Sequence, residues 1–184
     1  QRTKESSARL SRRKCVREGC KDHTKLFQSS KYVCVVKVLV DSIYGGQDVR
    51  VLQLHTVCGF TSPGRIASDI DGILKEKGYE SYIAFGRGIP MNCSTPIRIG
   101  TKWDTYAHVA LTRVFDKHGF GSKKATREFL SMVEELDPDI IHLHNIHGYY
   151  LNVELLFDYL KLADKPVIWT LHDCWAFTGH CSHF

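Results

Sequence analysis

The chain has 184 residues, a length that suits one domain of ordinary size and is short for two. Its composition, with 43% hydrophobic and 24% charged residues, is typical of globular proteins and excludes collagen-like, mucin-like and wholly disordered classes. The best candidate for a membrane span, residues 32–40, is interrupted by Lys37 and is too short to cross a bilayer.

The net charge of +5 is unevenly distributed along the chain. Residues 1–37 contain 11 Lys and Arg against 3 acidic residues, whereas residues 38–184 contain 14 against 17. The basic character therefore belongs to an N-terminal arm that includes Arg9, Arg12 and Arg13. Such an arm can contact phosphates or anionic lipid, but a solvated tail is the simpler interpretation, and we expect no binding to nucleic acid.

Residues 1–48 do not share the pattern of the rest. Residues 31–40 have the composition of a strand, and Gly45-Gly46 resembles a linker, so this segment is either an added strand or has no native structure. We therefore divide the chain into a basic arm and linker, residues 1–48, which we expect to be poorly ordered, and one domain, residues 49–184.

From residue 49 onward, short β-branched runs alternate with helical patterns, which predicts an α/β fold: a Rossmann-like parallel sheet with helices on both faces. The first strand covers residues 49–56. The helix after it carries apolar residues at helical spacing over 66–74, with Ser62 as its N-cap, Pro63 at its first position and Gly78 as its stop.

The remaining strands are expected at residues 81–85, 97–99, 139–143 and 167–171, and a further helix over about 151–162. Two more helices lie between the third and fourth strands, and each carries an apolar stripe that we expect to face the core. The stripes are Ala107, Ala110, Leu111, Val114 and Phe115, and then Ala125, Phe129, Met132, Val133 and Leu136.

The seven cysteines are scattered, as in a protein of a reducing compartment, and we expect no disulfides. Cys15 and Cys20 lie near His23, and Cys174 and Cys181 lie near three histidines: His172, His180 and His183. A zinc-binding module is therefore an alternative, although neither group has the second CxxC-like pair that a structural zinc site needs.

Polar residues follow four of the predicted strands at the point where each strand ends. In an open parallel sheet, ligands bind at the carboxyl ends of the strands, so these loops are expected to form one site. The residues that converge are Ser62, Gly64 and Arg65; Arg87; His144, Asn145, His147 and Gly148; and His172, Asp173 and Trp175.

Gly59 and Gly64 in the first turn allow a ligand to approach the backbone, where the helix N–H groups favour an anion or a sugar hydroxyl. The alternative, that these glycines only shape a tight turn, is equally consistent with the sequence. The G-x-G-x-x-G spacing of a dinucleotide fingerprint is missing, so we expect no nicotinamide or flavin cofactor.

Three histidines, His142, His144 and His147, suggest a metal site, but His142 falls inside a buried strand and no carboxylate accompanies them in sequence. We interpret His142 as a core histidine and assign substrate contacts to His144 and Asn145, with no metal. His172 and Asp173 leave a buried strand together, so that His172 can bond a ligand hydroxyl or phosphate while Asp173 orients it.

Five segments of the domain resemble the N-terminal half of family 4 glycosyltransferases, over about residues 49–184. Those near the C-terminal end are the most specific and resemble bacterial enzymes of cell-surface polysaccharide synthesis. The segments are Val51 to Leu54, Gly64 to Ala67, Tyr82 to Gly88, Asp139 to Gly148, and Trp169 to Cys181.

The resemblance implies a GT-B architecture and a retaining, metal-independent transfer of a hexosyl-type sugar from a nucleotide-sugar donor to a glycan or lipid-linked acceptor. It implies that His172 lies close to the reacting sugar, that Gly64 and Arg65 lie near the donor phosphates and acceptor, and that His144 and Asp173 line the same cleft. We also expect the chain to be cytoplasmic, with peripheral contact at the inner face of the membrane.

Two departures limit this resemblance. By this resemblance we expect the chain to lack the donor-binding domain and to stop, at Phe184, inside the first domain, and we expect residues 1–48 to have no counterpart in the family. We therefore expect a truncated acceptor-side domain that is inactive alone, since half of a catalytic constellation cannot align donor and acceptor. The alternative function is a non-catalytic glycan- or phosphate-binding module.

Overall fold

The computed structural model describes residues 48–179 and 181. The basic arm, the strand-like segment 31–40, Gly45-Gly46 and two of the histidines near the C-terminal cysteines lie outside these residues.

Five parallel strands form one sheet in the order β3-β2-β1-β4-β5, which confirms the predicted Rossmann-like α/β fold. Strand β1 lies at the centre and pairs with β2 on one side and β4 on the other. The chain therefore adds β2 and β3 outward on one side of β1 and then crosses over to add β4 and β5 on the other side, which makes β1 and β4 the switch point of the sheet. The strands are β1 (Arg50–Val57), β2 (Glu80–Arg87), β3 (Pro96–Arg98), β4 (Ile140–Leu143) and β5 (Val167–Trp169).

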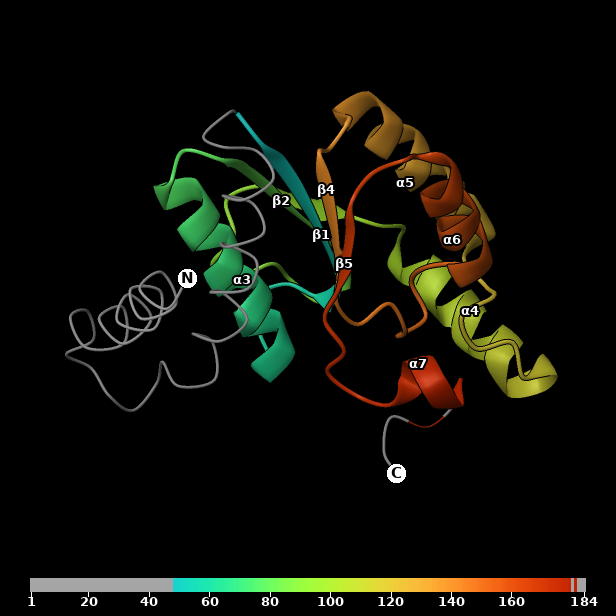
Figure 1. Ribbon diagram of the computed structural model, residues 1–184. Helices are drawn as coiled ribbons and strands as arrows, with labels where there is room; N and C mark the ends of the chain where they lie inside the picture. The colour runs from blue at the N-terminus through green and yellow to red at the C-terminus, as the bar shows by residue number, and fades with distance from the viewer. Residues whose placement is uncertain (1–47, 180, 182–184) are drawn as a thin grey trace, which may run out of the picture.

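Helices cover both faces of the sheet (Figure 1). Helix α3 (Ser62–Glu76) packs on one face, where Ile66, Ile70 and Leu74 meet residues of β1 and β4. Helices α5 (Lys123–Leu136) and α6 (Val153–Leu162) pack on the other face over a larger cluster. Burial of apolar side chains on both faces is the reason that β1, β2 and β4 have nearly continuous hydrophobic sequences.

The two ends of α3 test the capping predictions separately. Thr61, with φ 63°, takes the cap position without a side-chain hydrogen bond, so the prediction of Ser62 as N-cap was wrong by one residue and Pro63 is the second helical residue. Gly78 ends the helix as predicted: it has φ 84°, and its N–H donates to the carbonyl of Lys75 at 2.9 Å.

The expected orientation of the first of the two middle helices was wrong. In α4 (Lys102–Phe115) the predicted core stripe faces outward: Val114 and Phe115 are 70% and 65% exposed, and His108 is the buried residue of this helix. His108 faces inward, where its ring accepts a hydrogen bond from the N–H of Gly121 and contacts the hydroxyl of Ser122. Periodicity identified a common face and not the direction in which it points.

The second stripe is confirmed for Ala125, Phe129 and Val133 of α5, which are buried, whereas Met132 is 43% exposed and Leu136 is half-buried, so the prediction was wrong for Met132. The last helix, α7 (Trp175–Thr178), is a single turn beyond β5. No helix in the described part of the chain is both long and apolar enough to cross a membrane.

Candidate functional site

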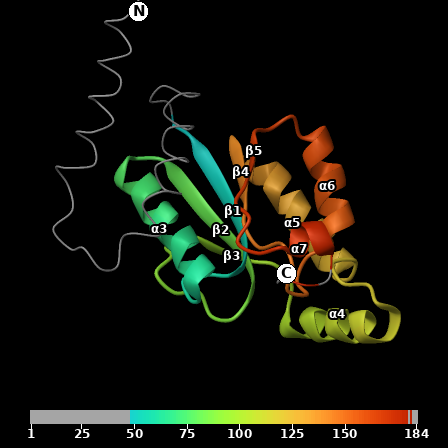
Figure 2. The same cartoon turned by 60° about the horizontal axis from the view of Figure 1, so that its bottom comes forward.

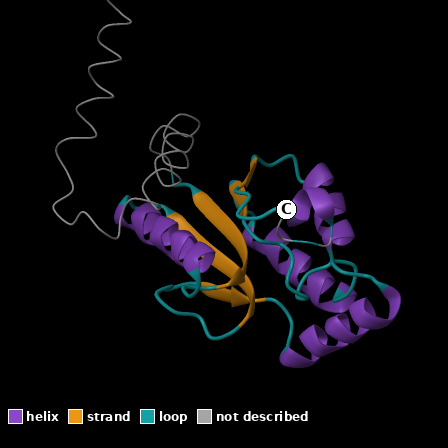
Figure 3. Cartoon of the chain, turned by 90° about the horizontal axis from the view of Figure 1, so that it is seen from below, coloured by secondary structure: helices purple, strands orange, loops and turns teal. Residues whose placement is uncertain are grey.

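The loops that follow β1, β4 and β5 meet at the carboxyl edge of the sheet, which Figure 3 shows from below. The parallel arrangement requires this, because all five strands end on the same side. Two clusters of polar side chains form there, one behind the other, and His172 and Asp173 belong to different clusters.

The inner cluster consists of four imidazole rings. His55, His142 and His144 are each at most 1% exposed, and the ring of His172 is stacked on that of His144 with centroids 5.3 Å apart. The His142 ring lies beside His144, with centroids 4.1 Å apart, and its Nε2 bonds the hydroxyl of Thr170 at 2.8 Å. This confirms that His142 is a core histidine with a hydrogen-bonded partner.

A continuous chain of hydrogen bonds runs through this cluster from helix α3 to His172. The side-chain amide of Gln53 donates to the carbonyl oxygen of Ala67 at 3.1 Å, and its oxygen lies 3.1 Å from Nε2 of His144. Nδ1 of His144 lies 3.0 Å from Nε2 of His172. Side chains from the middle of β1 and from the loops after β4 and β5 are thereby linked in a fixed order, which we call the relay: Gln53, His144 and His172.

Only one set of proton positions satisfies the relay when both rings are neutral. The carbonyl of Ala67 can only accept, so the amide nitrogen of Gln53 faces it and the amide oxygen faces His144. That oxygen needs a proton on Nε2 of His144, which leaves Nδ1 of His144 as an acceptor for the Nε2–H of His172. The second ring nitrogen of His172, Nδ1, is then the unprotonated one.

Burial keeps these imidazoles neutral. It lowers the pKa of His142 to about 3 and that of His55 to about 4, and it holds the pKa of His144 well below its usual value. Burial also lowers the pKa of His172, although the neighbouring Asp173 carboxylate acts in the opposite direction. At neutral pH the relay is therefore an uncharged donor and acceptor array.

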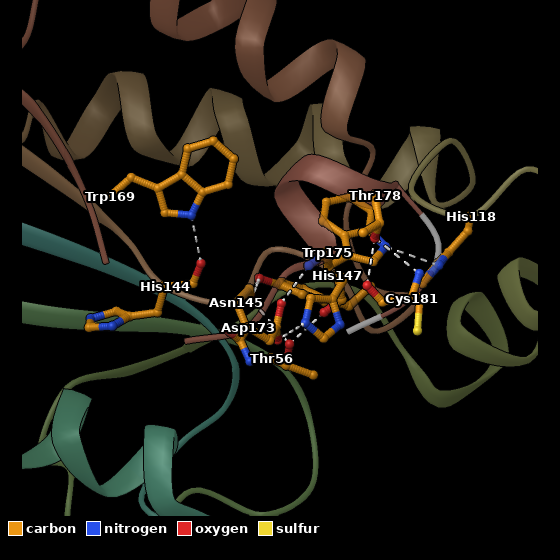
Figure 4. Close-up of polar contacts among 11 residues, drawn as sticks. Thr56, His118, His144, Asn145, His147, Trp169, Asp173, Trp175, Thr178 and Cys181 are labelled. Carbon is orange, nitrogen blue, oxygen red and sulfur yellow. Dashed lines mark hydrogen bonds and ion pairs between the residues drawn. The ribbon is translucent and has the colours of Figure 1, made fainter. Parts of the chain in front are cut away.

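The outer cluster holds the end of strand β1 at Thr56 and the loops after β4 and β5 together (Figure 4). Nε2 of His147 lies 2.7 Å from the Asp173 carboxylate, which also accepts the backbone N–H of Trp175 at 3.0 Å. The hydroxyl of Thr56 donates to the carbonyl oxygens of Asn145 and His147. Burial alone would raise the pKa of Asp173, but the hydrogen bonds from His147 and Trp175 bring it below its usual value.

A small hollow joins the two clusters. Its volume is about 10 Å³, close to what a single water molecule needs. The polar residues that line it are His144, Asn145, His147, His172 and Asp173, with Trp169 and Trp175 among the apolar ones. Within the described residues, no group of three metal-ligating side chains converges on one point.

The structure brings four of the predicted site residues together and leaves the others apart. His144, Asn145, His172 and Asp173 line the same hollow. The remaining four predicted residues are not among those that line it. Of those, Ser62 and Arg65 are exposed in the first turn of α3, Gly64 is buried there, and Arg87 lines a different hollow with Arg98 and Lys102.

His144 occupies a different position from the one expected. It is 1% exposed and both its ring nitrogens have protein partners, so it lies behind His172 and supports it. Sequence reasoning also missed Gln53 and His55. The signal available for both was a polar residue inside an apolar strand, because such a residue needs a buried partner.

Comparisons with known proteins were made for the whole chain. No family model and no solved structure matches it. It is 23% identical over 146 residues to the putative colanic acid biosynthesis glycosyl transferase WcaC of Escherichia coli strain K12. The match covers 73% of this chain and 36% of the relative, so the chain spans little more than a third of that protein's length. This similarity relates the chain to glycosyltransferases.

Proposed function

We propose that the chain is the acceptor-side part of a retaining family 4 glycosyltransferase with GT-B architecture. The observation that carries the proposal is the neutral His172 imidazole, which lines a hollow at the carboxyl edge of the sheet and is held in one protonation state by the relay. A sugar hydroxyl needs both donors and acceptors in fixed positions, and an imidazole near neutral pH supplies either one.

The proposed reaction transfers a hexosyl-type sugar from a nucleotide-sugar donor to a glycan or lipid-linked acceptor in cell-surface polysaccharide synthesis. WcaC, whose description names colanic acid biosynthesis, supports this direction. We place the reaction in the cytoplasm at the inner face of the membrane. In this proposal His172 contacts the reacting sugar, Asn145 and Asp173 line the acceptor side, and Ser62, Gly64, Arg65 and Arg87 bind substrate further along the edge.

The roles of the two clusters differ in this scheme. The relay positions His172 and sets its tautomer, so Gln53 and His144 act through His172 without touching the substrate. The outer cluster fixes the loop that carries His172, because Asp173 is bonded both to His147 and to the start of α7. Neither cluster requires a metal ion or cofactor for this purpose.

A non-catalytic glycan- or phosphate-binding module is the second candidate, and the size of the hollow favours it. At about 10 Å³ the hollow holds one water molecule, so the described residues alone do not enclose a sugar ring. In that case the histidines that line the hollow would contribute to binding a glycan on an open surface, and no sugar would be transferred from a nucleotide-sugar donor.

Donor hydrolysis and sugar transfer separate the two candidates. We expect the chain alone to be inactive and the chain supplied with a donor-binding domain to transfer sugar. His172→Ala should abolish that transfer, whereas Lys161→Ala, at an exposed position of α6, should leave it unchanged. Glycan binding that is retained without any transfer, whatever domain is supplied, would favour the binding module and contradict the enzyme.

A further inference from the structure

Two cysteines from different loops meet beside helix α3. Cys58 directly follows β1, and Cys93 lies in the segment between β2 and β3. Cys58 is 0% exposed and belongs to a small apolar cluster with Ile83 and Phe85 of β2. Cys93 packs against that cluster from a half-buried position. Figure 2 shows α3 beside β1 and β2, whose carboxyl ends lead into these two loops.

The backbones of the two loops are in direct contact near Cys58. The N–H of Met91 donates to the carbonyl oxygen of Cys58 at 3.2 Å. The next residue, Gly59, has φ 77°, and a Cβ atom at this position would lie 1.7 Å from the carbonyl oxygen of Met91. Only glycine therefore allows the two loops to approach so closely.

A second contact holds the segment on the other side of Cys93. The hydroxyl of Thr95 donates to the carbonyl oxygen of Ser81 in β2 and accepts a hydrogen bond from the Lys75 ammonium group of α3 at 2.8 Å. Met91 and Thr95 each lie two positions from Cys93. Cys93 is thus held beside Cys58 by contacts on both sides of it.

The two thiols are hydrogen-bonded to each other. The S–H of Cys93 donates to the sulfur of Cys58 and lowers the pKa of Cys58, and the hydroxyl of Ser68 acts in the same direction. The same bond keeps the proton on Cys93 and raises the pKa of that thiol. Both residues are free cysteines in the structure. Because the sulfurs are adjacent, a small adjustment brings them to the distance of about 2.05 Å that a disulfide requires.

We propose that Cys58 and Cys93 form a dithiol site, which low-molecular-weight disulfides such as glutathione disulfide oxidise to an intramolecular disulfide. Disulfides are rare in reducing compartments, and those that form there are usually transient and catalytic or redox-sensing. Cys93 is the thiol that an external disulfide reaches, since Cys58 is fully buried. The inference goes beyond the proposed function and does not depend on sugar transfer.

Oxidation proceeds in two exchange steps. The sulfur of Cys93 attacks one sulfur of glutathione disulfide, whose S–S bond breaks, and one glutathione leaves with the proton of Cys93. The sulfur of Cys58 then attacks the sulfur of Cys93 in this mixed disulfide, and the second glutathione leaves with the proton of Cys58. The two protein thiols lose two electrons and glutathione disulfide gains them. An excess of reduced glutathione reverses both steps.

The disulfide joins the loop before α3 to the segment before β3. Ser62 and Arg65, which are exposed in the first turn of α3, follow Cys58 closely, so oxidation restrains this end of the helix. A cross-link between positions 58 and 93 also restricts the unfolded chain. The thermal midpoint of unfolding should therefore rise by about 5–15 °C on oxidation.

Peptide mapping of the full chain in glutathione buffers tests the proposal. The folded chain is equilibrated with reduced and oxidised glutathione in varying ratio, its remaining thiols are alkylated, and linked peptides are assigned by mass spectrometry. We expect a Cys58–Cys93 peptide to form before any other pair as the oxidised fraction increases, and to disappear in excess reduced glutathione. In urea the same treatment should spread pairing over the seven cysteines.

Single variants identify the order of the two steps. Cys58→Ser should leave Cys93 as its mixed disulfide with glutathione, whereas Cys93→Ser should leave Cys58 unmodified because it is buried. Should Cys58→Ser fail to fold, Cys93→Ser, at a half-buried position, still tests the pair, because oxidation should no longer raise its thermal midpoint. Cys181→Ser, at an exposed position outside the pair, should keep both the cross-link and the rise.

Three results would overturn the proposal. Complete alkylation of Cys58 and Cys93 at every glutathione ratio would make the pair a packing contact of the core. A linked peptide that forms only in urea would assign the pairing to the unfolded chain. Preferential pairing of two other cysteines in the folded chain, with a thermal midpoint that rises equally in Cys93→Ser, would place the redox-sensitive site elsewhere.

Discussion

Replacing Gln53 with methionine tests the relay at its buried end. Methionine keeps the length of the side chain but removes the donor to Ala67 and the acceptor for His144, two contacts of 3.1 Å. Gln53 and His144 are 0% and 1% exposed, so water does not replace the lost partner. An unsatisfied buried N–H costs about 1–3 kcal/mol, and we expect the free energy of unfolding to fall by about that amount.

The effect on protonation is more specific than the effect on stability. Without the oxygen of Gln53, nothing holds the proton of His144 on Nε2, and its bond with His172 can form with the proton on either ring. NMR of labelled imidazole nitrogens should show His172 as the Nε2–H tautomer in the parent chain and as a mixture of tautomers in Gln53→Met.

A second buried amide supplies the control. Asn152 is 0% exposed and bonds the carbonyl of Phe120 at 2.7 Å and the N–H of Leu155 at 3.0 Å. Asn152→Leu should lower stability by a similar amount without changing the tautomer of His172. An unchanged His172 tautomer in Gln53→Met, or an equal change in Asn152→Leu, would refute the relay.

The remaining predictions concern stability. Burial lowers the pKa of His55 to about 4 and that of His142 to about 3, so below about pH 6.5 only the unfolded chain takes up these protons. The free energy of unfolding should then decrease with falling pH, by about 1.4 kcal/mol per pH unit for each such histidine, and a flat profile in denaturant titrations between pH 5 and 7 would contradict it. Thr101→Ala removes the capping box of α4 and should cost about 0.5–2 kcal/mol in the same titration, whereas no loss would show that the cap is not formed in solution. Gly86→Ala places a Cβ atom on the buried ring system of Tyr150, so we expect a loss of about 1–3 kcal/mol or more by calorimetry, and a neutral result would mean that Tyr150 moves freely.

The sheet was predictable because its strands are short apolar runs separated by turn residues. Strands and helices appear near the expected positions, and β5 was extended too far, since it ends at Trp169 and not at residue 171. The direction of the α4 face was not predictable from periodicity. Its inward contacts depend on His108 meeting the N–H of Gly121, a pairing between segments that spacing within the helix does not specify.

The sequence was sufficient to predict which loops meet at the candidate site, but it was not sufficient to predict which side chains bond one another there. Strand ends placed His144, His172 and Asp173 at one edge, as the parallel topology requires. The sequence suggested that Asp173 orients its neighbour His172, whereas its carboxylate bonds His147. Hydrogen-bond partners depend on side-chain directions after packing, and these are fixed by tertiary structure.

Sugar transfer tests the central claim most directly. The chain, supplied with a donor-binding domain, is incubated with labelled nucleotide sugars and with membranes that contain lipid-linked acceptors, and labelled product is counted for the parent, His172→Ala and Lys161→Ala. The proposed function predicts transfer by the parent and by Lys161→Ala, and loss of transfer in His172→Ala. Transfer that is undiminished in His172→Ala would contradict the assignment of this edge of the sheet as the active site.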